Sequence, residues 1–219
     1  MELSYWQSRW QKNNTGWHME TVYPQLPKLW PYLSIDKNSE VLVPLCGKSR
    51  DIRWLLEEGH TVTGVEISSK AIQKIKENYP HTFSKERSHG FIVHSSDQLT
   101  LWEGDFLTLP PDQVPAPAAI YDKAAIVALP PAMREKYAQK IMALCDPQTQ
   151  ILLQTFEYEQ DEMTGPPFSV PESEIHKRFG SHFSLHLLHE QSKFDQLKKF
   201  QQRGLSSGLM EKVFLLTPS

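Results

Sequence analysis

The chain has 219 residues, of which 39% are hydrophobic and 22% are charged, and its net charge at pH 7 is −3. This composition is typical of a globular protein, and it argues against disorder and against a basic nucleic-acid-binding surface. Cys46 and Cys145 are too far apart in sequence for a metal-ligand cluster, so no metal is expected. The sequence has neither an N-terminal export signal nor an apolar run of about eighteen residues, so we expect a cytoplasmic protein without a membrane span.

Residues 1–38 differ from the rest of the chain. They contain four tryptophans, and Trp6 and Trp10 lie one helical turn apart on the same face of a short predicted helix. The stretch "NNTG" at residues 13–16 ends this helix, and a proline-rich loop leads into a second helical piece. We therefore expect one domain over residues 1–219, made of a helical N-terminal extension (1–38) and an α/β core (39–219).

An alternation of strands and helices follows this extension. Short apolar runs rich in β-branched residues predict buried strands at residues 40–45, 60–67 and 149–158, and a further one within residues 117–129. Helices are predicted at residues 51–59, 68–78, 130–145 and 171–180, with Ser68 as a cap and prolines at the start of the last two. Residues 90–106 are predicted to form a hairpin, and two more strands are predicted at residues 182–189 and 209–217.

This order of elements predicts a doubly wound, mostly parallel sheet with helices on both faces. The last two strands are joined by a link that is short for a helical crossover, so they are expected to form an antiparallel edge. In such sheets, ligands bind outside the carboxyl ends of the strands, where the strand order reverses. The turn "PLCGK" at residues 44–48 follows the first core strand and is expected to lie at that place.

The turn resembles the end of a phosphate-binding loop, because Gly47 is followed by a lysine and a serine. A P-loop, however, needs another glycine five residues before Gly47, where this chain has Leu42. A dinucleotide fingerprint needs three glycines within six residues, and Gly47 stands alone. A ligand with a polyphosphate is therefore disfavoured, and Lys48 is interpreted as a surface charge.

Two acidic positions suggest a nucleoside instead. Glu66 ends the second core strand, where a carboxylate is the expected partner of a ribose diol, although a solvated acid at a strand end is the alternative. Asp105 and Phe106 end another strand and fit the edge and the face of an adenine, although a turn acid followed by a core Phe explains them equally well. Together these residues suit a nucleoside without phosphates, such as S-adenosylmethionine.

Asp122 and Lys123 lie at the carboxyl end of the third buried strand. Charges that are buried at such a place are costly unless they are paired or used, so we expect at least one of them to be functional.

Four stretches resemble the bacterial thiopurine S-methyltransferases, in the same order and through nearly the whole chain: "WQSRWQKNNTGWH", "VPLCGKSRDIRWLLEEGHTVTGVEIS", "YDKAAIVALPP" and "GPPFSV". The resemblance implies the class I methyltransferase fold, with a seven-stranded sheet, and S-adenosylmethionine as methyl donor with S-adenosylhomocysteine as product. It implies aromatic or heterocyclic thiols such as thiopurines as acceptors, a monomer in the cytoplasm, and no nucleic-acid or membrane partner. It also suggests selenium and tellurium compounds as further acceptors.

The resemblance assigns roles to individual residues. By it, the cofactor site comprises Trp6, Trp10, Leu45, Gly47, Glu66, Asp105, Phe106 and Lys123, and the acceptor site comprises Trp17, Phe168 and Arg203. Lys123 and Asp122 are the catalytic candidates, as a cation for the thiolate and as a proton acceptor. Position 123 is normally arginine in this family, and Lys123 keeps the charge but lacks the bidentate fork.

Two other functions stay open. A nicotinamide-dependent oxidoreductase uses a similar sheet but predicts a pyrophosphate site, which the missing glycines disfavour. A non-catalytic S-adenosylmethionine-binding protein is compatible with the lysine at position 123. The aromatic residues near the N-terminus are also explained by simple packing on the sheet.

Overall fold

The computed structural model describes residues 3–79 and 81–219. The chain divides into two compact units, Met1–Ile120 and Tyr121–Ser219, and each is described by itself. The division into an N-terminal extension and a core, which the sequence suggested, stays a prediction.

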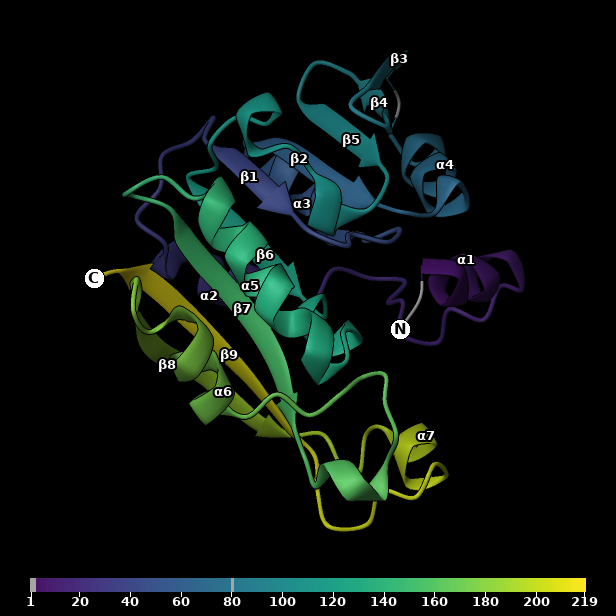
Figure 1. Ribbon diagram of the computed structural model, residues 1–219, viewed down its shortest axis with the longest axis vertical. Helices are drawn as coiled ribbons and strands as arrows, with labels where there is room; N and C mark the ends of the chain where they lie inside the picture. Colours follow the sequence, from purple (N-terminus) through teal and green to yellow (C-terminus); the bar gives the residue numbers. More distant parts are fainter. Residues whose placement is uncertain (1–2, 80) are drawn as a thin grey trace. The chain divides into compact units, whose positions relative to one another are not determined.

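Unit 1 begins with short helices and continues with alternating strands and helices (Figure 1). Its elements are α1 (Leu3–Gln11), α2 (Leu26–Leu29), η1 (Trp30–Tyr32), β1 (Glu40–Val43), α3 (Asp51–Glu57), β2 (Thr61–Glu66), α4 (Ser69–Glu77), β3 (Ser84–Ser88), β4 (Phe91–Ser95), β5 (Leu99–Glu103), η2 (Phe106–Thr108) and η3 (Pro111–Gln113). The first two residues of β6 (Ala119–Lys123) also belong to it.

The strands of unit 1 lie in the order β3-β4-β5-β2-β1, and the start of β6 pairs with the other side of β1. The pairs β5-β2, β2-β1 and β1-β6 are parallel, while β3-β4 and β4-β5 are antiparallel. The chain therefore proceeds from β1 to β2 in one direction and returns to the opposite side of β1 for β6. This is the expected switch point, and the turn after β1 lies at it.

Helix α4 shows why these segments fold as they do. Its apolar side chains, Ala71, Ile72 and Ile75, recur at helical spacing and are buried, while Lys74 and Glu77 on the other side are exposed. The hydroxyl of Ser68 accepts a hydrogen bond from the backbone N–H of Ala71 at 3.3 Å and caps the helix, as the sequence predicted. Burial of this apolar stripe fixes the helix on the sheet, directly after the end of β2.

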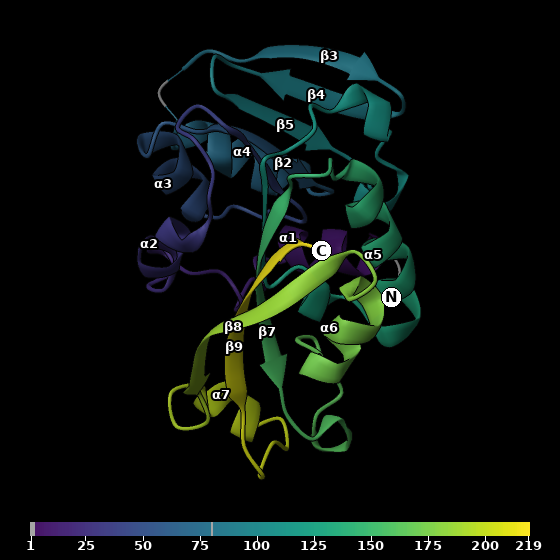
Figure 2. The same ribbon diagram turned by 90° about the vertical axis from the view of Figure 1, so that its left-hand side faces the viewer.

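Unit 2 begins inside β6 and is built around long antiparallel strands. Its further elements are η4 (Ile126–Ala128), α5 (Pro131–Leu144), β7 (Gln150–Glu157), η5 (Gln160–Glu162), α6 (Glu172–Phe179), β8 (Phe183–Ser192), α7 (Lys198–Gln201) and β9 (Met210–Pro218). The strand order is β6-β7-β9-β8, and the pairs β7-β9 and β9-β8 are antiparallel. Helices α5 and α6 lie side by side next to these strands (Figures 1 and 2).

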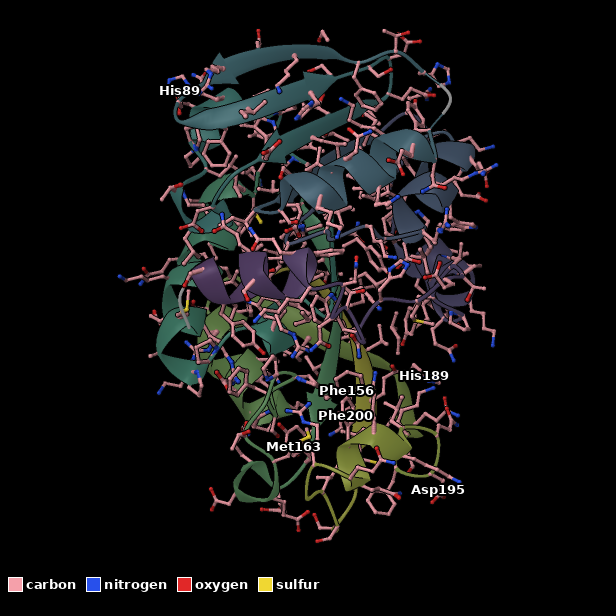
Figure 3. The ribbon with its side chains drawn as sticks, turned by 90° about the vertical axis from the view of Figure 1, so that its right-hand side faces the viewer. His89, Phe156, Met163, His189, Asp195 and Phe200 are labelled. Atoms are coloured by element: carbon pink, nitrogen blue, oxygen red, sulfur yellow. The ribbon has the colours of Figure 1, made fainter. Side chains whose placement is uncertain are left out.

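A separate apolar cluster of unit 2 lies where β7 ends and β9 begins. It contains Tyr158, Met163, Phe200, Leu205 and Leu209, with Phe156 packed against it. Figure 3 shows Phe156, Met163 and Phe200 close together. The cluster ties the loop after β7 to the segment around α7, and both of these segments contain predicted acceptor residues.

The structure confirms the mostly parallel α/β fold and its antiparallel edge, but the expected number of strands was wrong. Within the described residues, nine strands are present rather than seven. Strand β3 at the edge is polar and exposed, so it has no apolar signal. The strand predicted within residues 117–129 ends at Lys123, as expected. Ala124 follows with a positive φ of 64°, and the apolar residues beyond it form η4.

Candidate functional site

The turn after β1 has a constrained backbone. Leu45 and Gly47 both have positive φ values, 46° and 57°. The N–H of Cys46, between them, donates to the carbonyl of Val65 at 3.0 Å and so ties the turn to β2. A leucine in the left-handed region is strained, and such residues cluster at functional sites. The turn is thus a fixed structure at the carboxyl end of β1.

The carboxylate of Glu66 joins this turn to the end of β2. It accepts hydrogen bonds from the backbone N–H of Gly47 at 2.9 Å and from that of Ser68 at 2.8 Å, one on each oxygen. Glu66 is buried, and burial raises the pKa of its carboxyl to about 7, against the opposing effect of these hydrogen bonds. Each oxygen keeps a lone pair with which it can accept from a ligand hydroxyl.

The end of β5 lies beside Glu66. The N–H of Gly104 donates to the backbone carbonyl of Glu66 at 3.0 Å, and Asp105 follows directly. Asp105 caps η2 by accepting from the N–H of Leu107 at 3.0 Å, and Phe106 is buried. The structure therefore brings the predicted nucleoside residues to adjacent strand ends. The capping contact of Asp105 and the burial of Phe106 also match the alternative of a turn acid followed by a core Phe.

The N-terminal tryptophans form an aromatic group in unit 1. A Cβ built on Gly47 would lie 3.3 Å from Cζ2 of Trp10, so the indole packs directly on the turn. Trp17 meets Trp6 and Trp10 edge to face, with ring centroids 5.2 and 5.9 Å apart. The guanidinium of Arg9 lies 5.4 Å from the ring centroid of Trp17. The predicted residues Trp6, Trp10 and Trp17 are thus in one cluster, and Trp10 brings that cluster to the glycine turn.

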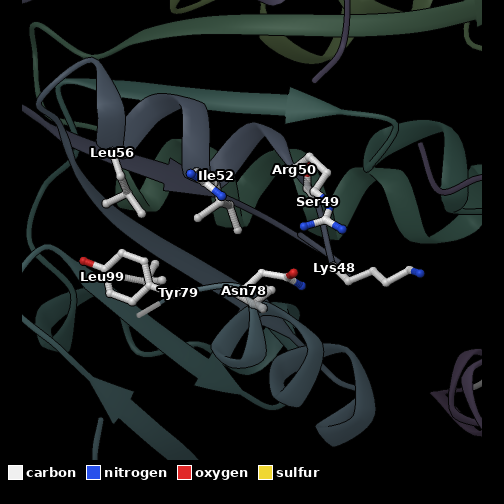
Figure 4. A pocket seen from close by; sticks show the side chains of 10 residues that line it. Lys48, Ser49, Arg50, Ile52, Leu56, Asn78, Tyr79 and Leu99 are labelled. Carbon is white, nitrogen blue, oxygen red and sulfur yellow. The ribbon is translucent and has the colours of Figure 1, made fainter. Parts of the chain in front are cut away.

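Lys48 is not arranged as a phosphate ligand. Its ammonium lies 3.5 Å from a carboxylate oxygen of Glu20, at a partly exposed position. A cavity nearby, lined in part by Lys48, Ile52, Leu56 and Tyr79, has a volume of about 20 Å³, which is room for about one water. Figure 4 shows the Lys48 side chain extending away from the apolar residues of this cavity. The cavity is therefore too small for a nucleotide.

Asp122, in unit 2, is buried and hydrogen-bonded on both oxygens. Its Oδ1 accepts from the N–H groups of Ala125 and Ile126, at 3.0 and 3.2 Å, and its Oδ2 accepts from the hydroxyl of Tyr137 at 2.7 Å. Burial raises the pKa of Asp122 to about 6, although these hydrogen bonds act in the opposite direction. The contacts hold the turn after Lys123 in place, and they favour a structural role over that of a proton acceptor.

The charges of Lys123 and Arg203, in unit 2, both act on Lys199. Burial lowers the pKa of Lys199, and the nearby charges of Lys123 and Arg203 lower it further. A guanidinium nitrogen of Arg203 donates to the carbonyl of Pro166 at 2.8 Å. Lys199 was not predicted, because no helix was expected in this segment and a lysine four residues before Arg203 gave no distinct signal. Three cations in one neighbourhood favour an anionic ligand.

Phe168, the other predicted acceptor residue of unit 2, is partly buried. Its N–H donates to the carbonyl of Val127 at 2.7 Å, and its ring lies 5.7 Å from the guanidinium carbon of Arg134. Arg134 was also missed. It lies in the predicted helix 130–145, and nothing in the sequence indicated that its side chain is only 1% exposed.

Cys46 is a packing residue rather than a nucleophile. It is buried, and burial together with the charge of Glu66 raises the pKa of its thiol well above the usual value. A thiol held in the protonated form is a poor nucleophile.

Within the described residues, no helix is both long and apolar enough to cross a bilayer.

Comparison with known proteins identifies the family. The family model for thiopurine S-methyltransferase matches residues 1–219. The chain is 41% identical to a probable thiopurine S-methyltransferase of Yarrowia lipolytica, over 99% of this chain and 100% of that protein. It is 39% identical to a thiopurine S-methyltransferase of Pseudomonas fluorescens, over 98% of each chain.

Solved structures support the fold. A Burkholderia thailandensis 1,6-didemethyltoxoflavin N1-methyltransferase with bound S-adenosylhomocysteine superposes with a TM-score of 0.61 at 16% identity, over 98% of this chain and 86% of that chain. A methyltransferase from Anabaena variabilis gives a TM-score of 0.63 at 12% identity, over 99% and 94% of the two chains. The family match and the two relatives confirm the resemblance inferred from the sequence motifs. The chain belongs to the thiopurine S-methyltransferase family.

Proposed function

We propose that the protein transfers the methyl group of S-adenosylmethionine to the sulfur of aromatic or heterocyclic thiols such as thiopurines. The observation that carries the proposal is the Glu66 carboxylate, which the N–H of Gly47 holds at the end of β2, beside a turn with no pyrophosphate cradle. The relatives that match over their full length are named for this activity.

The residues of unit 1 fit the cofactor. Glu66 has lone pairs left for the two ribose hydroxyls, and Asp105 and Phe106 adjoin it for the adenine. Gly47 lacks a side chain where the backbone must come close to a ligand and to Trp10. In this proposal, Leu45 presents its backbone to the cofactor, and α1, through Trp6 and Trp10, excludes water from the site. When bound, S-adenosylmethionine supplies an already activated methyl group.

The acceptor residues are proposed from the resemblance, with support from their own surroundings. Lys123 stabilises the acceptor as a thiolate, and its charge and that of Arg203 both act on the neighbouring Lys199. Trp17 and Phe168 provide flat apolar surfaces for an aromatic ring. Asp122 holds the turn that follows Lys123, through Ala125, Ile126 and Tyr137.

We also propose that the protein works as a monomer in the cytoplasm, with a small-molecule acceptor and without a nucleic-acid partner. The net charge of −3 supports the absence of nucleic acid, and the two free cysteines suit a reducing compartment.

Methyl transfer from labelled S-adenosylmethionine to a panel of aryl thiols, thiopurines and a selenol tests the proposal. We expect turnover on several thiols, with S-adenosylhomocysteine as the second product. Intact cofactor binding without turnover on any acceptor would instead indicate a binding protein. Micromolar affinity for NAD, with none for S-adenosylmethionine, would indicate an oxidoreductase.

A further inference from the structure

The ring of Phe168 is in contact with two groups of unit 2. A Cβ built on Gly165 would lie 2.5 Å from Cδ1 and 2.7 Å from Cε1 of Phe168, so the ring rests directly on the glycine backbone. The guanidinium carbon of Arg134 lies over the same ring, 5.7 Å from its centroid. Gly165 also has a φ of 67°, which a larger residue rarely adopts. These contacts restrict where the ring can lie.

Arg134 is an unusual partner because it is almost fully buried. Its Nε donates to the carbonyl of Leu129 at 2.8 Å, and its Nη1 pairs with a carboxylate oxygen of Glu174 at 2.6 Å. Its Nη2 is buried and makes no hydrogen bond within the described part of the chain. A buried cation is costly unless neighbouring groups compensate it, and the electron-rich face of Phe168 is one such group. Two fixed hydrogen bonds keep the guanidinium at one place.

The backbone around Phe168 is held as well. The N–H of Phe168 donates to Val127, the hydroxyl of Tyr158 donates to the carbonyl of Pro167 at 2.7 Å, and Arg203 donates to Pro166. The segment 165–168 is therefore anchored to η4, to the end of β7 and to the segment after α7. With the backbone anchored, the contacts with Arg134 and Gly165 decide the orientation of the ring.

From these contacts we infer that Arg134 and Gly165 are positioning residues, which fix the Phe168 ring as a rigid wall for the methyl acceptor. The inference rests on the proposed function, in which Phe168 contacts the acceptor. A wall that is ordered before binding costs the acceptor less entropy, and a displaced wall changes which rings fit. Arg134 thus contributes to acceptor affinity and selectivity without touching the acceptor.

The rival explanation is that Arg134 only stabilises the packing of α5 and α6 through Glu174. Arg178 provides the matched control, since it pairs with the same Glu174 at 2.6 Å and with Glu135 at 2.9 Å. In the part of the chain that the structure describes, the ion pairs of Arg178 are with glutamates and do not involve the ring, so we expect Arg178→Met to disturb the helix pair and spare Phe168.

The experiment compares Arg134→Met, Arg134→Lys, Gly165→Ala and Arg178→Met, each alone and combined with Phe168→Leu. The full-length protein is assayed for KM and kcat with a small and a bulky aryl thiol, for S-adenosylhomocysteine affinity by calorimetry, and for Tm. We expect Arg134→Met and Gly165→Ala to raise the acceptor KM about tenfold, with cofactor affinity within about twofold. We expect Arg134→Lys to retain part of the effect, and Arg134→Met to add nothing further once Phe168 is leucine.

The inference would be overturned if Arg134→Met raised the acceptor KM by the same factor in the natural protein and in the Phe168→Leu background. It would also be overturned if Arg178→Met raised the acceptor KM as much as Arg134→Met does. If Phe168→Leu leaves acceptor binding unchanged in an enzyme that still methylates thiols, the inference fails and the proposed function stands. A natural chain that neither methylates nor binds any aryl thiol overturns both. If Arg134→Met does not fold, Arg134→Lys and Gly165→Ala decide the question.

Discussion

The side chain of Glu66 and the backbone of Gly47, 19 residues apart in sequence, are joined by a hydrogen bond of 2.9 Å. The second oxygen of Glu66 accepts from the N–H of Ser68, at the start of α4. One carboxylate therefore fixes both the turn after β1 and the turn after β2. The same carboxylate is the proposed ribose ligand, so its contacts set the place where the cofactor hydroxyls bind.

Replacing Glu66 tests this assignment. Glu66→Ala is expected to weaken S-adenosylhomocysteine binding by about 1–3 kcal/mol, because charge-assisted hydrogen bonds to the ribose are lost and two buried N–H groups lose their acceptor. Calorimetry measures the effect. Glu103→Gln is the control. Glu103 also ends a strand next to β2, but its carboxylate pairs with His94 at 3.1 Å and is not assigned to the cofactor, so this change should leave the affinity unaltered. Unchanged affinity in Glu66→Ala would remove Glu66 from the cofactor site.

The raised pKa of Glu66 predicts a pH dependence of stability. Its carboxyl binds its proton more tightly in the folded state, since burial raises the pKa from 4.5 to about 7. The resulting stability is fully present below pH 4.5 and is lost as the pH rises through 7. Asp122 contributes in the same direction, because its pKa is raised from 3.8 to about 6. The natural protein is therefore compared with Glu66→Gln, in which the contribution of Asp122 is unchanged.

Urea unfolding at pH 4.5 and pH 8 measures this difference. We expect the free energy of unfolding of the natural protein to fall by roughly 1–3 kcal/mol more than that of Glu66→Gln between these values. Parallel pH dependences of the two proteins would show that Glu66 titrates normally.

Gly47→Ala is expected to disturb the contact between the turn and α1. The new methyl group would lie 3.3 Å from the Trp10 ring, and the residue would keep a φ of 57°. A destabilisation of more than about 1 kcal/mol is expected, together with weaker cofactor binding, since both the strain and the displaced indole act at the site. Gly16→Ala is the control, because a Cβ there would meet nothing within 4 Å. Tryptophan fluorescence and calorimetry compare the two variants, and equal effects would contradict the role of the contact.

Much of the fold was predictable because the signals were local. The apolar run of β1, the Ser68 cap and the position of Glu66 at a strand end follow from patterns of a few residues. Strand β3 was missed because an exposed edge strand such as Ser84–Ser88 needs no apolar side chains. The end of β6 at Lys123 was expected, but the positive φ of Ala124 and the turn into η4 have no signature in the sequence.

The site was predictable in its residue types but not in its contacts. The sequence placed Asp122 at the end of a strand, yet its three donors come from residues 125, 126 and 137, and only folding brings Tyr137 to it. Arg134 looks like any charged residue of an amphipathic helix, and its burial depends on Glu174, 40 residues later. Such long-range pairings decide which charged residues are buried, and composition does not reveal them.

Lys123 is expected to act through its positive charge. Lys123→Arg keeps the charge and adds a bidentate fork, so kcat/KM for an aryl thiol should be preserved or raised. Lys123→Met should lower kcat/KM by about 10- to 100-fold, most strongly for thiols that ionise poorly at the assay pH. Lys136→Met, at an exposed position on α5, is the control and should change nothing. A large loss in Lys123→Arg would show that the site is shaped around lysine rather than around its charge.

Asp122 distinguishes a structural role from a chemical one. Its carboxylate accepts from Ala125, Ile126 and Tyr137, so Asp122→Asn should destabilise the protein by about 1–3 kcal/mol, because an amide cannot accept on both sides. Tyr137→Phe removes the donor at 2.7 Å, and combining the two changes should cost less than their sum, since they break the same contact. We expect kcat of the folded Asp122→Asn protein to stay within about threefold, because Lys123 keeps its charge. A general base contributes about 10²–10⁴ to the rate. A loss of that size in kcat, with stability unchanged, would therefore make Asp122 the proton acceptor.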